Sequence, residues 1–189
     1  SDPDLNHLES VFKKLDLLAV MDIFCTETAS CADVVLPAAA WAEKDGTYTN
    51  TERRVQRIRK ALDPPGEALP DTEILTRLAR AMGAHWNTAP AEASMREINA
   101  LVPSYRGITY ARIAQEGLHW PCPAEDHPGT PILHVQGFTR GKGLFTVTDY
   151  RPAAEEADEQ YPFTLTTGRI LYQYHTATMS RRSQGLVSR

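Results

Sequence analysis

Residues 17–37 read LLAVMDIFCTETASCADVVLP and contain two short apolar runs separated by a polar stretch. The runs, Leu17–Met21 and Val34–Leu36, are apolar without alternation, which is typical of strands buried on both faces of a parallel sheet. The polar stretch Thr26–Ala32 is compatible with a helix. This order predicts an α/β fold and places Asp22 at the carboxyl end of the first strand, where open α/β sheets bind their ligands.

Two further segments predict helices. Apolar residues recur at helical spacing from Leu5 to Leu15. Asp71 can cap a helix that carries an apolar face as far as Met82 and is stopped by Gly83. Between these helices and beyond the second strand, a turn signal at residues 45–46 leads into short extended pieces on either side of residue 50.

The second half of the chain predicts less regular structure. Weak helical patterns cover residues 92–101 and 105–116, and the prolines between residues 121 and 131 indicate a connector. Short strands are predicted at residues 144–147 and 163–167, with an acidic, alanine-rich segment between them. We therefore expect a domain boundary in this acidic segment.

The composition excludes some classes of partner. The formal net charge is -4 and the isoelectric point is near 5.9, so the chain has no electrostatic reason to bind nucleic acid or an anionic membrane. No apolar run approaches the roughly 20 residues that span a bilayer, and no export signal is present. The first residue is Ser1, and we interpret the chain as an internal piece of a longer protein.

The three cysteines, Cys25, Cys31 and Cys122, include no CxxC pair. The sequence therefore supports neither a disulfide framework nor a zinc or iron–sulfur site. We assign no catalytic residue and no metal ligand in this chain, and we expect a reduced, cytoplasmic setting.

Two polar stretches could bind a ligand. Residues 166–169 read TTGR, in which a glycine allows close approach and an arginine offers donors to phosphate, and residues 174–182 add hydroxyl, imidazole and cationic donors. A solvated surface loop would explain this composition equally well. The basic run at residues 52–60 is interpreted mainly as a solvated face. By composition alone, Asp22, Lys44 and Asp71 would be a strand-end turn, a surface lysine and a helix cap.

The stretch from Thr26 to Gln56 resembles a signature of molybdopterin-guanine-dinucleotide oxidoreductases. The segments PGEALPD at 65–71, WPCP at 120–123 and HPGTP at 127–131 resemble further parts of that family, in the same order. Within the family the chain is most similar to formate dehydrogenases, above all in TERRVQRIRKAL at 51–62 and TTGRILYQYHTATMSRRS at 166–183. Assimilatory nitrate reductases share most of these residues.

The resemblance implies two sets of residues that bind a bis(molybdopterin guanine dinucleotide) cofactor carrying Mo or W. The first set belongs to a guanosine-binding region, where carboxylates can accept hydrogen bonds from guanine or ribose: Asp22, Lys44 and Asp71. The second belongs to a loop around the pterin and phosphate portions: Thr167, Gly168, Arg169, His175 and Thr176.

The resemblance also implies a fold: a Rossmann-like α/β/α domain at residues 1–155 and the beginning of a β-barrel domain at residues 156–189. The family's metal-binding cysteine or selenocysteine, its neighbouring histidine, its substrate-binding arginine and its [4Fe-4S] cysteine motif have no counterpart in this chain. We therefore expect a fragment that is inactive alone and that contributes to formate oxidation only with the rest of its subunit and with electron-transfer subunits.

Two alternatives stay open at this point. One is nitrate reduction on the same cofactor. The other is a scaffold role without molybdenum, as in the large subunit of NADH:quinone oxidoreductase. The concentration of donors between Thr167 and Thr176 argues against the scaffold, because a scaffold needs no such set.

Overall fold

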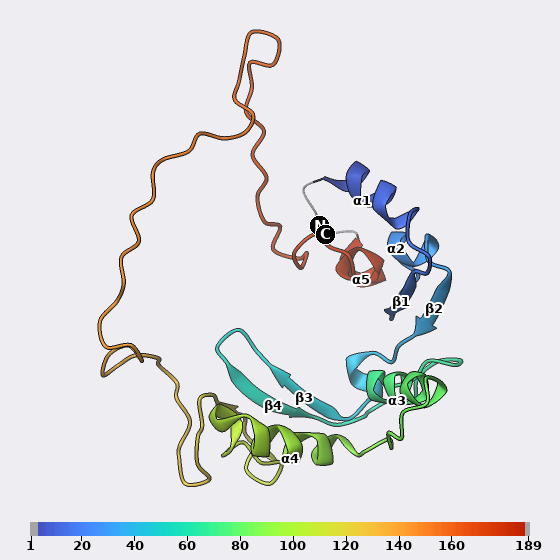
Figure 1. Cartoon of the computed structure of the whole chain (residues 1–189), viewed down its shortest axis with the longest axis vertical. Coiled ribbons are helices and arrows are strands. Elements are labelled where there is room, and N and C mark those ends of the chain that lie inside the picture. Colours follow the sequence, from blue (N-terminus) through green and yellow to red (C-terminus); the bar gives the residue numbers. More distant parts are fainter. Residues whose placement is uncertain (1–3, 188–189) are drawn as a thin grey trace. The chain divides into compact units, whose positions relative to one another are not determined.

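The structure is a computed structural model that describes residues 4–187, and it divides into two units, residues 4–133 and residues 134–187. Figure 1 shows the course of the chain, in colours that follow the sequence. The helices are α1 (Leu5–Phe12), α2 (Glu27–Ser30), α3 (Asp71–Ala81), α4 (Ala91–Leu101) and α5 (Gln184–Val187). The strands are β1 (Ala19–Asp22), β2 (Val34–Pro37), β3 (Gly46–Thr49), β4 (Arg54–Ile58) and β5 (Leu118–His119).

The predicted order of strand, helix and strand in residues 17–37 is confirmed, but the expectation that both strands are buried is wrong, because their residues are exposed or half-buried in this structure. β1 and β2 pair in parallel, with Ala19 opposite Val34 and Asp22 opposite Pro37. Between them α2 begins after Thr26, whose side-chain oxygen accepts from the Ala29 N–H at 3.2 Å. The fold is thus mixed α/β, and its first sheet is parallel.

The helix predicted after Pro70 is confirmed as α3, although its cap is not the predicted one. Pro70 occupies the N-cap position and Asp71 is the first helical residue. The reason lies in Leu69, which is paired in parallel with Ala38 and keeps the chain extended up to Pro70. The stop is as predicted, because Gly83 follows the helix with φ of +89°, the left-handed conformation that favours glycine.

A second sheet is antiparallel, in the order β3–β4–β5. Its strands β3 and β4 form a hairpin, which confirms the predicted extended pieces on either side of residue 50. α4 confirms the weak helical pattern at 92–101. The core of this unit includes Val55 of β4 and Met95 of α4, together with Ile108, Tyr110, Ile113 and Cys122.

The helix predicted at residues 105–116 is wrong. Only the short 3-10 helix η2 (Pro103–Tyr105) precedes a series of turns. Gly107 packs against the Ala124 backbone so closely that no β-carbon would fit, and the turns that follow direct Ile108 and Ile113 into the core. Tertiary packing therefore overrides the local helical pattern. α1 is also shorter than predicted, because it ends at Phe12 rather than near Leu15.

The unit formed by residues 134–187 has little regular structure. Its elements are a 3-10 helix, η3 (Ser180–Arg182), and α5. The strands predicted at 144–147 and 163–167 are wrong for this structure, and Phe145 and Phe163 are 96% and 90% exposed. A strand needs a neighbour for its N–H and C=O groups, and these two segments pair with no other segment between residues 4 and 187.

The predicted domain boundary near residue 155 and the barrel after it stay predictions. Among the helices of residues 4–187, none combines the length and the apolar character that crossing a membrane would require.

Candidate functional site

Three chain segments end next to one another at the carboxyl edge of the parallel sheet. β1 ends at Asp22, beside the end of β2. The Ala38 N–H donates to the Asp22 carbonyl at 3.1 Å, and the Ala39 N–H donates to the Leu69 carbonyl at 2.8 Å. Successive N–H groups of one strand point to opposite neighbours, so Asp22 and Leu69 flank the end of β2. Since Asp71 follows two residues after Leu69, both predicted carboxylates lie at this edge.

Lys44 joins this edge through an ion pair. Its Nζ donates to Oδ2 of Asp71, and the two side chains are 24% and 38% exposed. Lys44 follows the 3-10 helix η1 (Trp41–Glu43), which is fixed by Glu43, whose Oε2 accepts from the Ala40 N–H at 2.8 Å. The structure thus brings two of the predicted residues into direct contact.

The two carboxylates have different surroundings. Asp71 lies in the first turn of α3, where the helix dipole and free N–H groups favour negative charge. Asp22 Oδ1 accepts from the Phe24 N–H at 3.1 Å and so closes a turn after β1. The edge therefore presents acceptors on two separate elements, together with the Lys44 ammonium as a donor.

A surface cavity of about 420 Å³ opens beside Lys44. Its lining includes Asp45 and Lys60, which flank the β3–β4 hairpin, and Pro70 and Thr72 at the start of α3. The volume is within the range of small-molecule sites, and charges of both signs line it.

The other predicted residues, Thr167, Gly168, Arg169, His175 and Thr176, belong to the unit 134–187 and are exposed. Thr167 to Arg169 lie in an extended segment without regular structure. His175 and Thr176 lie in a turn, and His175 has φ of +53°, in the left-handed region. A β-carbon on Gly168 would meet no atom of the described chain within 4 Å, so the space beside it is open.

Comparison with known proteins finds one family model and several relatives that are similar to this chain. The model of the molybdopterin oxidoreductase family matches residues 1–81. An F420-dependent formate dehydrogenase subunit alpha from Methanocaldococcus jannaschii is 56% identical to the chain over 191 residues, which cover 99% of this chain and 28% of that protein. Residues 1–81 of the chain are thus similar to the molybdopterin oxidoreductase family, and nearly the whole chain is similar to a formate dehydrogenase alpha subunit.

Other formate dehydrogenases are also similar to the chain. The F420-dependent formate dehydrogenase 1 subunit alpha of Methanococcus maripaludis is 54% identical over 97% of this chain and 28% of its own length. A putative formate dehydrogenase of Staphylococcus haemolyticus is 43% identical over 97% of the chain and 19% of its own length. The chain therefore spans 19–28% of the length of these relatives.

Among solved structures, acetylene hydratase from Pelobacter acetylenicus matches 60% of this chain and 15% of its own, with 24% identity and a TM-score of 0.45.

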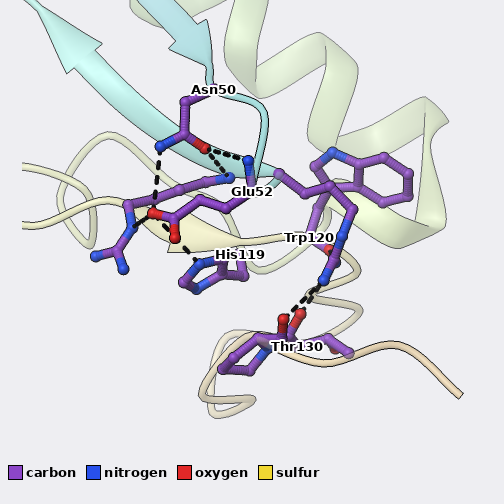
Figure 2. A network of polar contacts seen from close by, with 8 residues as sticks. Asn50, Glu52, His119, Trp120 and Thr130 are labelled. Carbon is purple, nitrogen blue, oxygen red and sulfur yellow. Dashed lines mark hydrogen bonds and ion pairs between the residues drawn. The ribbon is translucent and has the colours of Figure 1, made fainter.

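The sequence did not identify Arg53, which holds the loop after β5. Its Nη1 donates to the carbonyls of Trp120 and Thr130, the latter at 3.0 Å, and its Nη2 donates to the Pro131 carbonyl at 2.9 Å. The guanidinium also lies 5.9 Å from the centre of a Trp120 ring (Figure 2). A planar group with several donors suits such a set of carbonyls.

The interpretation of residues 52–60 as a solvated face is therefore wrong for Arg53 and Arg57, whereas Arg59 is exposed as expected. Besides Arg53, Arg57 packs over the buried Tyr110 ring, with 4.6 Å between the guanidinium carbon and the ring centre. Arg59 Nη2 donates to the Ala114 carbonyl at 2.7 Å. The strand alternation could have found Arg57, because it lies on the same face of β4 as the buried Val55.

Figure 2 also shows the charged contacts at the turn between β3 and β4. Glu52 Oε1 accepts from Arg54 Nε at 2.7 Å and from Asn50 Nδ2 at 3.2 Å, and it lies 3.8 Å from His119 Nε2. The hydrogen bonds from Asn50 and then Arg54 hold the pKa of Glu52 below its usual value. These contacts stabilise the turn, and none of them involves a predicted site residue.

Within residues 4–187, no group of three or more His, Cys, Asp or Glu side chains is placed to hold a metal ion. Cys25 and Cys31 are exposed, whereas Cys122 is buried.

Proposed function

We propose that this chain is part of the catalytic subunit of a molybdenum- or tungsten-dependent formate dehydrogenase and that it helps to hold a bis(molybdopterin guanine dinucleotide) cofactor. The main support is the similarity to three F420-dependent formate dehydrogenase alpha subunits, at 51–56% identity over 97–100% of this chain. This similarity favours formate over nitrate as the substrate, and it favours an enzyme over the scaffold subunit of a quinone oxidoreductase.

The chemistry of the sheet edge fits the guanosine part of such a cofactor. Guanine presents two adjacent donors, N1–H and the N2 amino group, and ribose presents hydroxyls, all of which a carboxylate can accept. Asp22 and Asp71 supply carboxylates at the carboxyl edge of a parallel sheet, the usual place for a nucleotide. Lys44 supplies a cationic donor beside them. We assign these three residues to one guanosine.

The loop of the second unit fits the pterin and phosphate parts. Arg169 and His175 are donors suited to phosphate oxygens, and Thr167 and Thr176 add hydroxyls. Gly168 leaves open space in which a ligand could approach the backbone. We assign these five residues to the same cofactor.

We further propose that residues 1–155 belong to a Rossmann-like α/β/α domain and that residues 156–189 begin a β-barrel domain. The parallel pairing of β1 and β2 supports the first part. The exposed apolar side chains of Phe163 and Leu165 support the second, because an apolar segment of this kind suits a strand that pairs with other strands of a longer protein.

The bound metal centre would supply the redox chemistry, in which formate loses two electrons and a proton to give CO₂. Residues of this chain would bind and orient the cofactor. A [4Fe-4S] cluster in another part of the subunit and partner subunits would carry the electrons onward. We expect this chain to be inactive alone, and we expect the whole enzyme to be cytoplasmic.

The test is cofactor content in the full-length subunit. Lys44→Ala and Arg169→Ala are each purified beside wild type, and bound metal and guanine nucleotide released by acid are measured. We expect each variant to retain less than about a third of the wild-type content, since each loses a charged contact to the ligand. Lys14→Ala and Arg151→Ala, at exposed positions outside both sets, are the matched controls and should retain full content. Full content in both Lys44→Ala and Arg169→Ala would reject the proposal.

A further inference from the structure

Ser180 differs in burial from the residues around it in its unit. Between residues 134 and 186, whose side chains the structure describes, it is the one buried residue, with 8% of its surface exposed. A buried residue in such an open segment is usually apolar, because apolar burial drives packing. A serine in this position is therefore explained by its hydrogen bonds.

The Ser180 hydroxyl both donates and accepts. It donates to Gln173 Oε1 at 2.7 Å and accepts from the Tyr174 N–H at 3.1 Å. The amide nitrogen of Gln173 is also hydrogen-bonded, because Nε2 donates to the Leu186 carbonyl at 3.0 Å. The hydrogen bond between Ser180 and Gln173 thus joins the two ends of the loop that lies between them.

The backbone inside this loop is held in an uncommon conformation. His175 and Ala177 have φ of +53° and +61°, in the left-handed region that residues with a β-carbon rarely adopt. The Ala177 N–H donates to the Tyr174 carbonyl at 2.9 Å, and the Arg181 N–H donates to the Ala177 carbonyl at 3.1 Å. Such conformations persist where the surrounding contacts fix them.

We propose that Ser180 and Gln173 are positioning residues that shape the cofactor loop before the cofactor binds. This inference rests on the proposed function, in which His175 and Thr176 lie at the tip of the loop and contact the cofactor. A loop that is already shaped loses less conformational entropy on binding, so the ligand dissociates more slowly. Ser180 and Gln173 themselves need not touch the cofactor.

The first experiment measures the loop without cofactor. The full-length subunit is produced in a host that cannot make molybdopterin, and amide hydrogen exchange is followed in peptides covering residues 170–183. Ser180→Ala should raise the exchange rate of the Tyr174 amide about tenfold, because that amide loses its acceptor. Ser180→Thr keeps the hydroxyl and should restore protection. Ser183→Ala, at an exposed serine nearby, is the control and should change nothing. Equal exchange in wild type and Ser180→Ala would overturn the proposal.

The second experiment measures cofactor release from the loaded subunit. Ser180→Ala should release the cofactor about tenfold faster than wild type, and Ser180→Thr should release it at close to the wild-type rate. His175→Ala separates the two proposals. If His175→Ala releases the cofactor at the wild-type rate, the assignment of this loop in the proposed function fails. If His175→Ala accelerates release while Ser180→Ala does not, the positioning role fails and the proposed function stands.

Discussion

Lys44 and Asp71 are 27 residues apart in the sequence and form an ion pair at the carboxyl edge of the parallel sheet. The contact joins the segment that leads into the β3–β4 hairpin to the first residue of α3. Both side chains are partly exposed, so water screens their attraction and the pair adds little to stability. A chemical role toward a ligand explains the pair better than a role in folding.

Lys44→Met in the full-length subunit should therefore weaken cofactor binding with little effect on the stability of the fold. We expect the melting temperature of the cofactor-free protein to fall by less than about 3 °C, which corresponds to the loss of an exposed ion pair. We expect cofactor content to fall far more. Calorimetry and metal analysis on the same samples provide the two measurements. A large fall in melting temperature with unchanged cofactor content would show that the pair is structural.

The sequence predicted the carboxyl edge of the parallel sheet but not the ion pair between Lys44 and Asp71. Apolar runs on both sides of Thr26 predicted two parallel strands, and that pattern alone placed Asp22 at a carboxyl end. Leu69 could not be recognised as the third neighbour, because its pairing with Ala38 involves a single bridge without a strand pattern. The contact between Lys44 and Asp71 depends on that pairing, so only the three-dimensional structure reveals it.

Other differences have the same physical origin. The patterns at 144–147 and 163–167 predicted strands, yet strand formation depends on a partner that the pattern does not contain. In the basic run at residues 52–60, the charges predicted a solvated face. Instead, Arg53 donates to carbonyls and Arg57 packs on an aromatic ring, and these partners are far away in the sequence. The local signal predicted α3 well, because a helix satisfies most of its own backbone hydrogen bonds.

Arg53 should not tolerate replacement by lysine, although the charge is kept. A lysine ammonium is a compact group, and it cannot reach the carbonyls of both Thr130 and Pro131 in the geometry of a guanidinium. We expect Arg53→Lys to cost about 2 kcal/mol locally and to make the segment 121–131 more sensitive to limited proteolysis. Arg54→Lys, at the neighbouring half-exposed position, is the control and should leave that segment as resistant as in wild type. Equal cleavage of both variants would contradict this account.

We expect any side chain at position 107 to destabilise the protein. A β-carbon there would lie 2.6 Å from the Ala124 carbonyl carbon and 2.8 Å from Cys122 Sγ, and neither the backbone nor the buried thiol can move aside easily. We expect Gly107→Ala to destabilise the core by about 3 kcal/mol or more, seen as loss of soluble protein or a lower melting temperature. Gly46→Ala is the matched control, because its β-carbon would meet nothing within 4 Å and its φ is not in the left-handed region. A stable Gly107→Ala protein would mean that residues 107 and 124 are not packed in this way.

The stability of the unit 4–133 should depend on alkaline pH through the Tyr110 phenol. Burial raises the pKa of its phenol above the usual value near 10, and Arg57 offsets part of that rise. The unfolded chain therefore loses this proton at lower pH than the folded chain. Stability from Tyr110 is complete below pH 10 and falls as the pH rises above that value.

Tyr110→Phe removes this proton and keeps the ring under Arg57. We expect the variant to lose less stability than wild type between pH 9 and pH 11, measured as the change in melting temperature of the cofactor-free subunit over about that range. Tyr150→Phe removes a tyrosine that is 88% exposed and should behave as wild type, because its side chain lies outside the core. If Tyr110→Phe and Tyr150→Phe follow the same pH dependence, the Tyr110 phenol is not buried against the core in solution.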